Sequence, residues 1–206
     1  MNDPSMPPEA ELNLTKRALD AIAAFRFPVH LMTKSDLVLR DLDALCRINQ
    51  IYAAVSFSIT TDDEVGKKLE PGAPRVSDRL HAMRVLADHG IDTGTTMMPV
   101  LPSIENTPDN LRCIVEPAHA CGASHVIPWF GMSLRDRQPV YYYGKLDELF
   151  PALRQVYERA FGDQYVCRTP NADQLTHLLK QLGEARGIAT QMRPYRPATA
   201  TQMSLL

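Results

Sequence analysis

The chain has 206 residues, of which 45% are hydrophobic, and a formal net charge of −2. This length suits one domain with an appendage, and the near-zero charge lacks the basic footprint that broad nucleic-acid binding requires. No charged-then-apolar leader opens the sequence, and no apolar run approaches the roughly 18 residues that cross a bilayer, so we expect a cytoplasmic protein without a membrane span.

Short β-branched runs alternate with amphipathic helical stretches over the first 130 residues, which is typical of βα units and a parallel sheet. Asn13 is the expected N-cap of the first helix, and Pro117 is expected to kink the last helix of this region or end it early. The predicted strands are 29–33, 52–59, 92–100 and 124–130. The predicted helices are 14–25, one from Asp36 or Asp41 to Ile48, 62–69, one from Ser77 or Asp78 to Gly90, and 109–120.

The pattern changes beyond Gly131. Leucines and aromatics at helical spacing predict a helix pair over 141–161 that is broken at Pro151, and a last helix from Asn171 to Gly187. The segment 193–206 has no periodicity and is expected to be a frayed tail. We therefore divide the chain into a βα region at 1–133, a helical extension at 134–192 and the tail.

Cysteine and histidine placement gives no support for a metal site. The four cysteines have no zinc or iron–sulfur spacing, and the six histidines form no i, i+4 pair. No P-loop, dinucleotide fingerprint or Ser/His/Asp order occurs, so nucleotide hydrolysis and serine hydrolase chemistry have no positive signal. The cysteines are Cys46, Cys113, Cys121 and Cys167.

Sites in parallel sheets form at the carboxyl ends of the strands, so the residues after each apolar run are the candidates. Lys34 could pair with a carboxylate or phosphate, or could be a solvated loop lysine paired with Asp36. Ser58 and Thr60 carry hydroxyls that suit a nucleoside, although Thr60 or Thr61 reads more simply as the N-cap of the next helix.

Three further candidates are open to two interpretations each. Glu70, before Pro71 and Gly72, either anchors a tight turn or takes part in chemistry, and the turn is favoured. Met98 and Pro99 either line a base pocket or belong to the core. Trp129 either stacks on a base or packs under the C-terminal helices, and the following cations and tyrosines (134–137 and 141–143) form a candidate substrate-facing patch.

Four segments in this order resemble the radical S-adenosylmethionine (SAM) enzymes of the spore photoproduct lyase-like group, often labelled DNA repair photolyase. They are Phe27–Asp41, Ala53–Thr60, Leu69–Pro74 and Thr96–Pro102. The resemblance implies a partial TIM-type barrel of six βα units, of which this chain matches strands three to six. Met1–Pro7 resembles the turn after the second strand of that barrel.

The resemblance also implies a chemistry. Such enzymes cleave SAM reductively with a [4Fe-4S] cluster held by a C-x3-C-x2-C motif, and the named member acts on a thymine dimer lesion in DNA. It implies that Lys34 contacts the SAM carboxylate and that Ser58, Met98 and Pro99 contact the rest of SAM, with Thr60 and Trp129 completing the predicted set. This chain has no such cysteine motif. We therefore expect an N-terminally shortened radical SAM lyase that holds no cluster and is inactive alone.

Two other functions are left open by the residues. One is a cluster-free binding or scaffold protein that self-associates through an exposed sheet edge at 29–33. The other is a fragment of a TIM-barrel lyase or aldolase, for which Lys34 would be the Schiff-base lysine.

Overall fold

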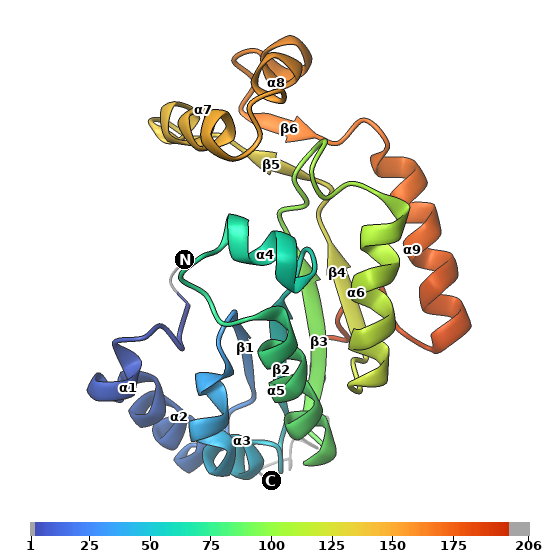
Figure 1. Ribbon diagram of the computed structural model, residues 1–206. Helices are drawn as coiled ribbons and strands as arrows, with labels where there is room; N and C mark the ends of the chain where they lie inside the picture. The colour runs from blue at the N-terminus through green and yellow to red at the C-terminus, as the bar shows by residue number, and fades with distance from the viewer. Residues whose placement is uncertain (1–2, 198–206) are drawn as a thin grey trace, which may run out of the picture.

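A four-stranded parallel sheet forms the centre of the computed structural model, which describes residues 3–197. The strands lie in chain order, and helices connect each strand to the next (Figure 1). This succession of βα units is part of a TIM-type barrel, which confirms the predicted fold class. The strands are β1 (Val29–Thr33), β2 (Ala53–Ser58), β3 (Asp92–Met97) and β4 (His125–Pro128).

The helices cover one face of this sheet. α2 packs against α3, and α5 packs against β2 and β3. No helix within residues 3–197 is both long and apolar enough to cross a membrane. The helical elements up to β4 are α1 (Glu9–Leu12), α2 (Leu14–Ala24), the 3-10 helix η1 (Asp36–Asp41), α3 (Leu42–Ile48), α4 (Asp63–Leu69), α5 (Val76–Asp88) and α6 (Pro108–Ala120).

Strand alternation gives the sheet an apolar face and a polar face. Val55, Phe57 and Met97 point toward the helices and are buried in the main core. On the opposite face the parallel register places His30 beside Ala54, and Gly94 between Ser56 and His125. The polar face is therefore the one that the partial barrel wraps around.

A separate unit follows β4, and we call residues 131–168 the arm. β5 (Gly131–Ser133) pairs antiparallel with β6 (Val166–Arg168), and α7 (Gln138–Leu149) and α8 (Arg154–Phe161) lie between them in sequence. The predicted break of the helix pair near Pro151 is confirmed, but the two short strands were not predicted. Figure 1 shows the arm at the same end of the sheet as α4.

The arm has its own small core, built from Met132, Leu146, Tyr157, Phe161 and Cys167. Leu101 and Ile104, from the loop after β3, pack against this core. The arm is thus fastened to the sheet through that loop.

The last helix, α9 (Ala172–Arg186), packs against α6 and ends at Gly187, as predicted. Gly187 takes the left-handed conformation. The chain then returns to the sheet, where Ala189 bonds Ser124 and Val126 at the edge of β4. Residues 193–197 of the predicted tail form no helix or strand, and 198–206 lie outside the described residues.

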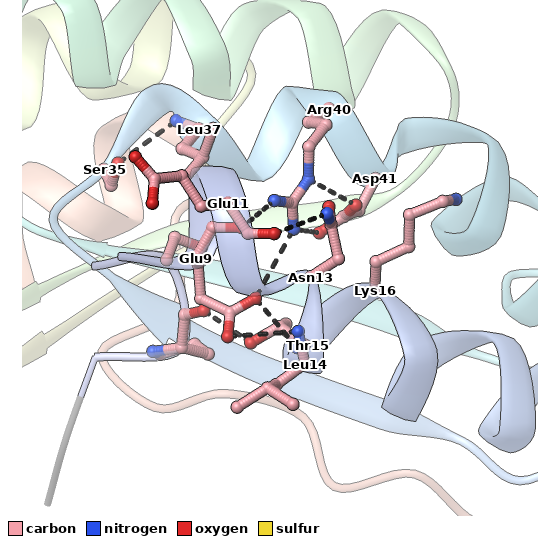
Figure 2. A network of polar contacts seen from close by, with 12 residues as sticks. Glu9, Glu11, Asn13, Leu14, Thr15, Lys16, Ser35, Leu37, Arg40 and Asp41 are labelled. Carbon is pink, nitrogen blue, oxygen red and sulfur yellow. Dashed lines mark hydrogen bonds and ion pairs between the residues drawn. The ribbon is translucent and has the colours of Figure 1, made fainter. Parts of the chain in front are cut away.

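Asn13 stands at the N-cap of α2, as predicted, but its side chain makes no capping bond. The carboxylate of Glu9 does this instead, because Glu9 accepts hydrogen bonds from the backbone N–H groups of Leu14 (3.2 Å) and Thr15 (2.9 Å). Figure 2 shows Arg40 beside the same carboxylate, with its guanidinium also forked on Asp41 (2.8 and 2.9 Å).

Other boundaries also differ from prediction. α5 begins at Val76, and Ser77 lies inside its first turn with its N–H bonded to Asp63. Pro117 does not stop α6, which continues to Ala120. Strands β3 and β4 end earlier than predicted because the chain turns away from the sheet into the loops that follow them. We call the loop after β3, from Pro99 to Glu105, the mouth loop, and the Met98–Pro99 peptide bond at its start is cis.

The contact between Gly94 and His125 gives a stability prediction. A Cβ on Gly94 would lie 2.3 Å from the His125 ring, so Gly94→Ala should lower the free energy of unfolding by about 1–3 kcal/mol. Urea denaturation of both proteins measures this. The control is Gly144→Ala in α7, where an added Cβ meets nothing within 4 Å and should be neutral or stabilising. Equal effects of the two substitutions would contradict this packing.

Candidate functional site

All six candidate residues lie at the carboxyl ends of the strands. Lys34 follows β1 and Ser58 ends β2, while Met98 and Pro99 follow β3 and Trp129 follows β4. Lys34, Thr60 and Pro99 line one cavity of about 510 Å³, and Ser58, Met98 and Trp129 do not line it. The structure therefore brings half of the predicted set together.

The cavity is enclosed by three parts of the chain. They are α4 with the Glu70 turn, the loop from Pro99 to Glu105, and the inner side of α7. Its volume falls in the range of pockets that bind drug-sized ligands. The lining residues are Lys34, Thr60, Thr61, Lys67, Lys68, Leu69, Glu70, Pro71, Pro99, Leu101, Glu105, Tyr141, Tyr142, Lys145, Glu148 and Leu149.

Glu70 joins two cations at the base of the cavity. One carboxylate oxygen pairs with the ammonium of Lys34, and the other accepts from Nη2 of Arg79 at 2.8 Å. Arg79 is 3% exposed and also donates to the carbonyls of Ser58 (2.7 Å) and Pro74 (3.0 Å). Glu70 is thus an anchor, as the sequence favoured, while the Lys34 side chain is 40% exposed and able to change partner.

Asp3 holds the backbone at Lys34. Its carboxylate accepts from the Thr33 hydroxyl (2.7 Å) and from the Lys34 N–H (2.7 Å), and it also accepts from the Ser5 N–H (2.8 Å). The backbone from which the Lys34 side chain extends is therefore held in place. The sequence showed Asp3 only as part of a Pro- and Ser-containing turn, because its partners lie about 30 positions away in the chain.

Thr60 bonds a buried carboxyl and does not cap a helix. Asp62 is the N-cap of α4, so the predicted capping role of Thr60 or Thr61 is wrong. The Thr60 hydroxyl donates to Glu105 at 2.7 Å, and the other Glu105 oxygen accepts from the Leu101 N–H at 2.8 Å. Burial raises the pKa of Glu105 to about 7.

Asn110, near the start of α6, completes this arrangement. Its amide donates to the carbonyls of Thr60 and Glu105, both at 2.8 Å. The end of β2, the loop after β3 and α6 are therefore joined around the Glu105 carboxyl. Sequence analysis did not single out Glu105 or Asn110, since neither belongs to a local motif.

The remaining candidates lie apart from the cavity. The Ser58 hydroxyl pairs with that of Thr96 across the strands at 3.1 Å. Trp129 is 38% exposed, and its backbone bonds Met97 and Val100 while its ring is not buried under the C-terminal helices. An exposed ring at the strand end leaves the stacking interpretation open, as a prediction.

Tyrosines of α7 form the outer wall. Tyr141 is 71% exposed, and Tyr142 donates to the Tyr157 hydroxyl (3.0 Å), which in turn donates to the carbonyl of Pro102. Burial raises the pKa of Tyr142 to about 12, so this hydroxyl stays protonated and keeps α7 bonded to the mouth loop. Of the predicted aromatic patch, Tyr141 and Tyr142 reach the cavity, whereas Tyr143 packs against the arm's core.

A second polar group crosses the concave face of the sheet. Ser124 donates to Asp92, so its oxygen accepts from Nδ1 of His125 at 2.9 Å. The other His125 nitrogen then accepts from the Ser56 hydroxyl (2.7 Å), whose oxygen accepts from His30 (2.8 Å). The hydrogen-bond pattern assigns the proton of neutral His125 to Nδ1.

The residues present do not suit an iron–sulfur cluster. Cys46 lies on α3, Cys113 on α6 and Cys121 at its end, and Cys167 is buried in β6. Between residues 3 and 197 no three His, Cys, Asp or Glu side chains are placed to hold a metal ion. Because a cluster needs thiolates that converge on one site, none of the chemistry below is assigned to a cluster on this chain.

Comparison with known proteins finds relatives that are similar to part of the chain. No family model matches it. A protein of Mycobacterium tuberculosis without an assigned function is 28% identical over 163 residues, 76% of this chain and 48% of the relative. The radical SAM Nα-GlyT isomerase of Pseudomonas phage M6 is 30% identical over 128 residues, 62% of this chain and 26% of the isomerase. The chain thus spans about half the length of its mycobacterial relative.

Two solved structures share the fold. A variant of spore photoproduct lyase with a dinucleoside spore photoproduct has a TM-score of 0.60 and 22% identity, over 84% of this chain and 54% of the lyase. The radical SAM methyltransferase TsrM from Kitasatospora setae, with tryptophan and a SAM analogue, has a TM-score of 0.54 and 12% identity, over 84% of this chain and 41% of the enzyme. The chain has a radical SAM-like fold.

The buried histidine gives a pH prediction. Burial lowers the pKa of His125 from 6.5, and also that of His30, so the folded state favours the neutral rings. This stabilisation is present above pH 6.5 and is lost as the pH falls through the folded value. We expect the free energy of unfolding, from urea titrations between pH 5 and 8, to fall below pH 6.5.

His125→Asn should flatten this pH profile, whereas His119→Asn, on the exposed side of α6, should leave it unchanged. A profile that both substitutions flatten equally would argue against a specific role of His125.

Proposed function

We propose that the chain binds SAM in the cavity at the carboxyl ends of β1 to β3, as the cofactor-binding part of a radical SAM lyase similar to spore photoproduct lyase. The observation that carries this is the position of Lys34, an exposed ammonium on a fixed backbone beside a pocket of about 510 Å³. The radical SAM-like fold supports the proposal.

The cavity offers partners for the carboxylate, the ribose and the adenine of SAM. Lys34 would turn from Glu70 to the SAM carboxylate, and Glu70 would keep its bond to Arg79 and so remain paired. Thr60 would face the ribose, and Pro99 with Leu101 supplies apolar surface for adenine. Ser58, Met98 and Trp129 would contact ligand that extends from the cavity onto the strand ends.

In a complete radical SAM enzyme a reduced cluster would donate one electron to the SAM sulfonium, which would break the C5′–S bond and release methionine and a 5′-deoxyadenosyl radical. The four cysteines do not converge, so we propose that the required thiolates come from outside these 206 residues and that the chain alone does not cleave SAM. Action on a DNA lesion belongs to this proposal, since the lyase neighbour contains a dinucleoside photoproduct. A cytoplasmic location is proposed with it.

A cluster-free scaffold is the alternative, and one observation favours it. Among the described strands β1 pairs only with β2, and the exposed rings of Phe25 and Phe27 lie just before it. An open edge beside apolar side chains favours self-association. A discrete oligomer in light scattering, together with no affinity for SAM, would support this alternative over the first proposal.

Lys34→Met tests the SAM site. Loss of a charge-assisted hydrogen bond should weaken SAM binding, measured by equilibrium dialysis, by about tenfold or more. Lys180→Met removes a lysine from the surface of α9 and should leave the affinity unchanged. SAM binding that is absent from the wild-type chain, or equal in both variants and the wild type, would refute the assignment.

Reconstitution with iron and sulfide tests the dependence on outside thiolates. Incubated anaerobically and then desalted, the chain should retain far fewer than four iron atoms and show no cluster absorbance, because its thiols are dispersed. A variant in which all four cysteines are serine should behave identically. A stoichiometric cluster on the wild-type chain, lost in that variant, would show that the thiols converge after all.

A further inference from the structure

The carboxyl groups of the cavity differ in whether a cation neutralises them. Glu70 pairs with Lys34 and Arg79, and Glu148 pairs with Lys145 at 2.6 Å. Glu105 also lines the cavity and is 2% exposed, but it has no ion-pair partner within residues 3–197. Its hydrogen bonds come from a hydroxyl and a backbone N–H, which are neutral donors.

The groups that face Glu105 come from every element around it. Glu70 and Lys34 act on it with opposite sign from the base of the cavity, and burial outweighs both. Burial raises the pKa values of Tyr142 of α7 and Tyr157 of α8, and the nearby charge of Glu105 adds to the rise. The carboxyl therefore lies between phenols that stay protonated and the Glu70 carboxylate, which already has two cationic partners.

Ionisation of Glu105 lowers the net charge of the cavity wall. Four lysines (34, 67, 68 and 145) and three glutamates (70, 105 and 148) line the cavity, so its net charge is +2 with Glu105 neutral and +1 with Glu105 ionised. A neutral Glu105 therefore leaves the wall more repulsive to a ligand that carries a fixed positive charge. With Glu105 ionised, a negative charge in a site removed from water is available to such a ligand.

We propose that Glu105 is the residue that selects a positively charged ligand here, and that it distinguishes SAM from S-adenosylhomocysteine. The two molecules differ by one methyl group, which makes the sulfur of SAM a permanent cation and leaves that of S-adenosylhomocysteine neutral. This inference rests on the proposed SAM site. Glu105 acts by its charge and leaves Lys34 to bind the carboxylate that both molecules share.

The protonation of Glu105 makes the selection measurable. Its pKa of about 7 means that binding of a cation must first, or simultaneously, release the carboxyl proton. The apparent affinity then scales with the ionised fraction of Glu105, which rises about eightfold between pH 6 and pH 7.5. The neutral thioether places no such demand on the carboxyl.

The experiment is a calorimetric titration of the full chain with SAM and with S-adenosylhomocysteine at pH 6.0 and 7.5, in buffers of different ionisation enthalpy. We expect SAM to bind about eightfold more tightly at pH 7.5 and to release protons, whereas S-adenosylhomocysteine shows neither effect. Equal pH profiles for the two ligands would overturn the role of Glu105 while keeping the SAM site. No binding of either ligand at either pH would overturn the proposed function as well.

Matched variants separate charge from structure. Glu105→Gln keeps the shape and should lose both the pH dependence and the preference for SAM, and Glu105→Asp keeps a carboxylate and should retain them. Glu184→Gln removes an exposed carboxylate of α9, outside the cavity, and should behave as the wild type. A Glu105→Gln protein that melts like the wild type and still prefers SAM would refute the inference.

Discussion

The candidate site depends on how the buried guanidinium of Arg79 is satisfied. An unpaired charge at this depth costs several kcal/mol, so its partners must stay in place. Those partners are Glu70 and the carbonyls of Ser58 and Pro74, which belong to the end of β2 and the turn that follows α4. Arg79, on α5, therefore fixes the floor of the cavity by holding one oxygen of the Glu70 carboxylate. The other oxygen of that carboxylate pairs with the Lys34 ammonium and positions it.

The three carboxyl groups that line the cavity differ in their surroundings. Glu148 is exposed at the rim and salt-bridged, Glu70 is held by a buried cation, and Glu105 is buried among neutral donors. Burial raises the pKa of Glu105 to about 7, and this residue lies where the mouth loop, β2 and α6 meet. Protonation of Glu105 is thus linked to the mouth loop, which fastens the arm to the sheet.

Sequence analysis recovered the parts of the fold that local pattern determines. The four parallel strands and the helices between them follow from alternation of β-branched and amphipathic segments, and Lys34 could be placed because it directly follows a strand. The two strands of the arm were not predicted, since a strand of three residues carries too little periodicity to be recognised in the sequence. Asp3, Glu9 and Glu105 act on partners brought near by folding or by an unusual turn, so no local signal marks their roles.

The hydrogen bonds on the polar face of the sheet decide whether the site can hold its shape without cluster ligands. A concave face with unsatisfied polar groups would collapse or need a ligand to hold it. Here Ser56 and Ser124 bridge His30, His125 and Asp92, so the groups of this face satisfy one another across three strands and the turn before β4. The mouth cavity lies at the other end of the same strands, and protein contacts such as those of Arg79 with Glu70 and of Thr60 with Glu105 hold its lining in place. Under the proposed function this chain therefore supplies the cavity for SAM, and the thiolates for radical chemistry come from outside it.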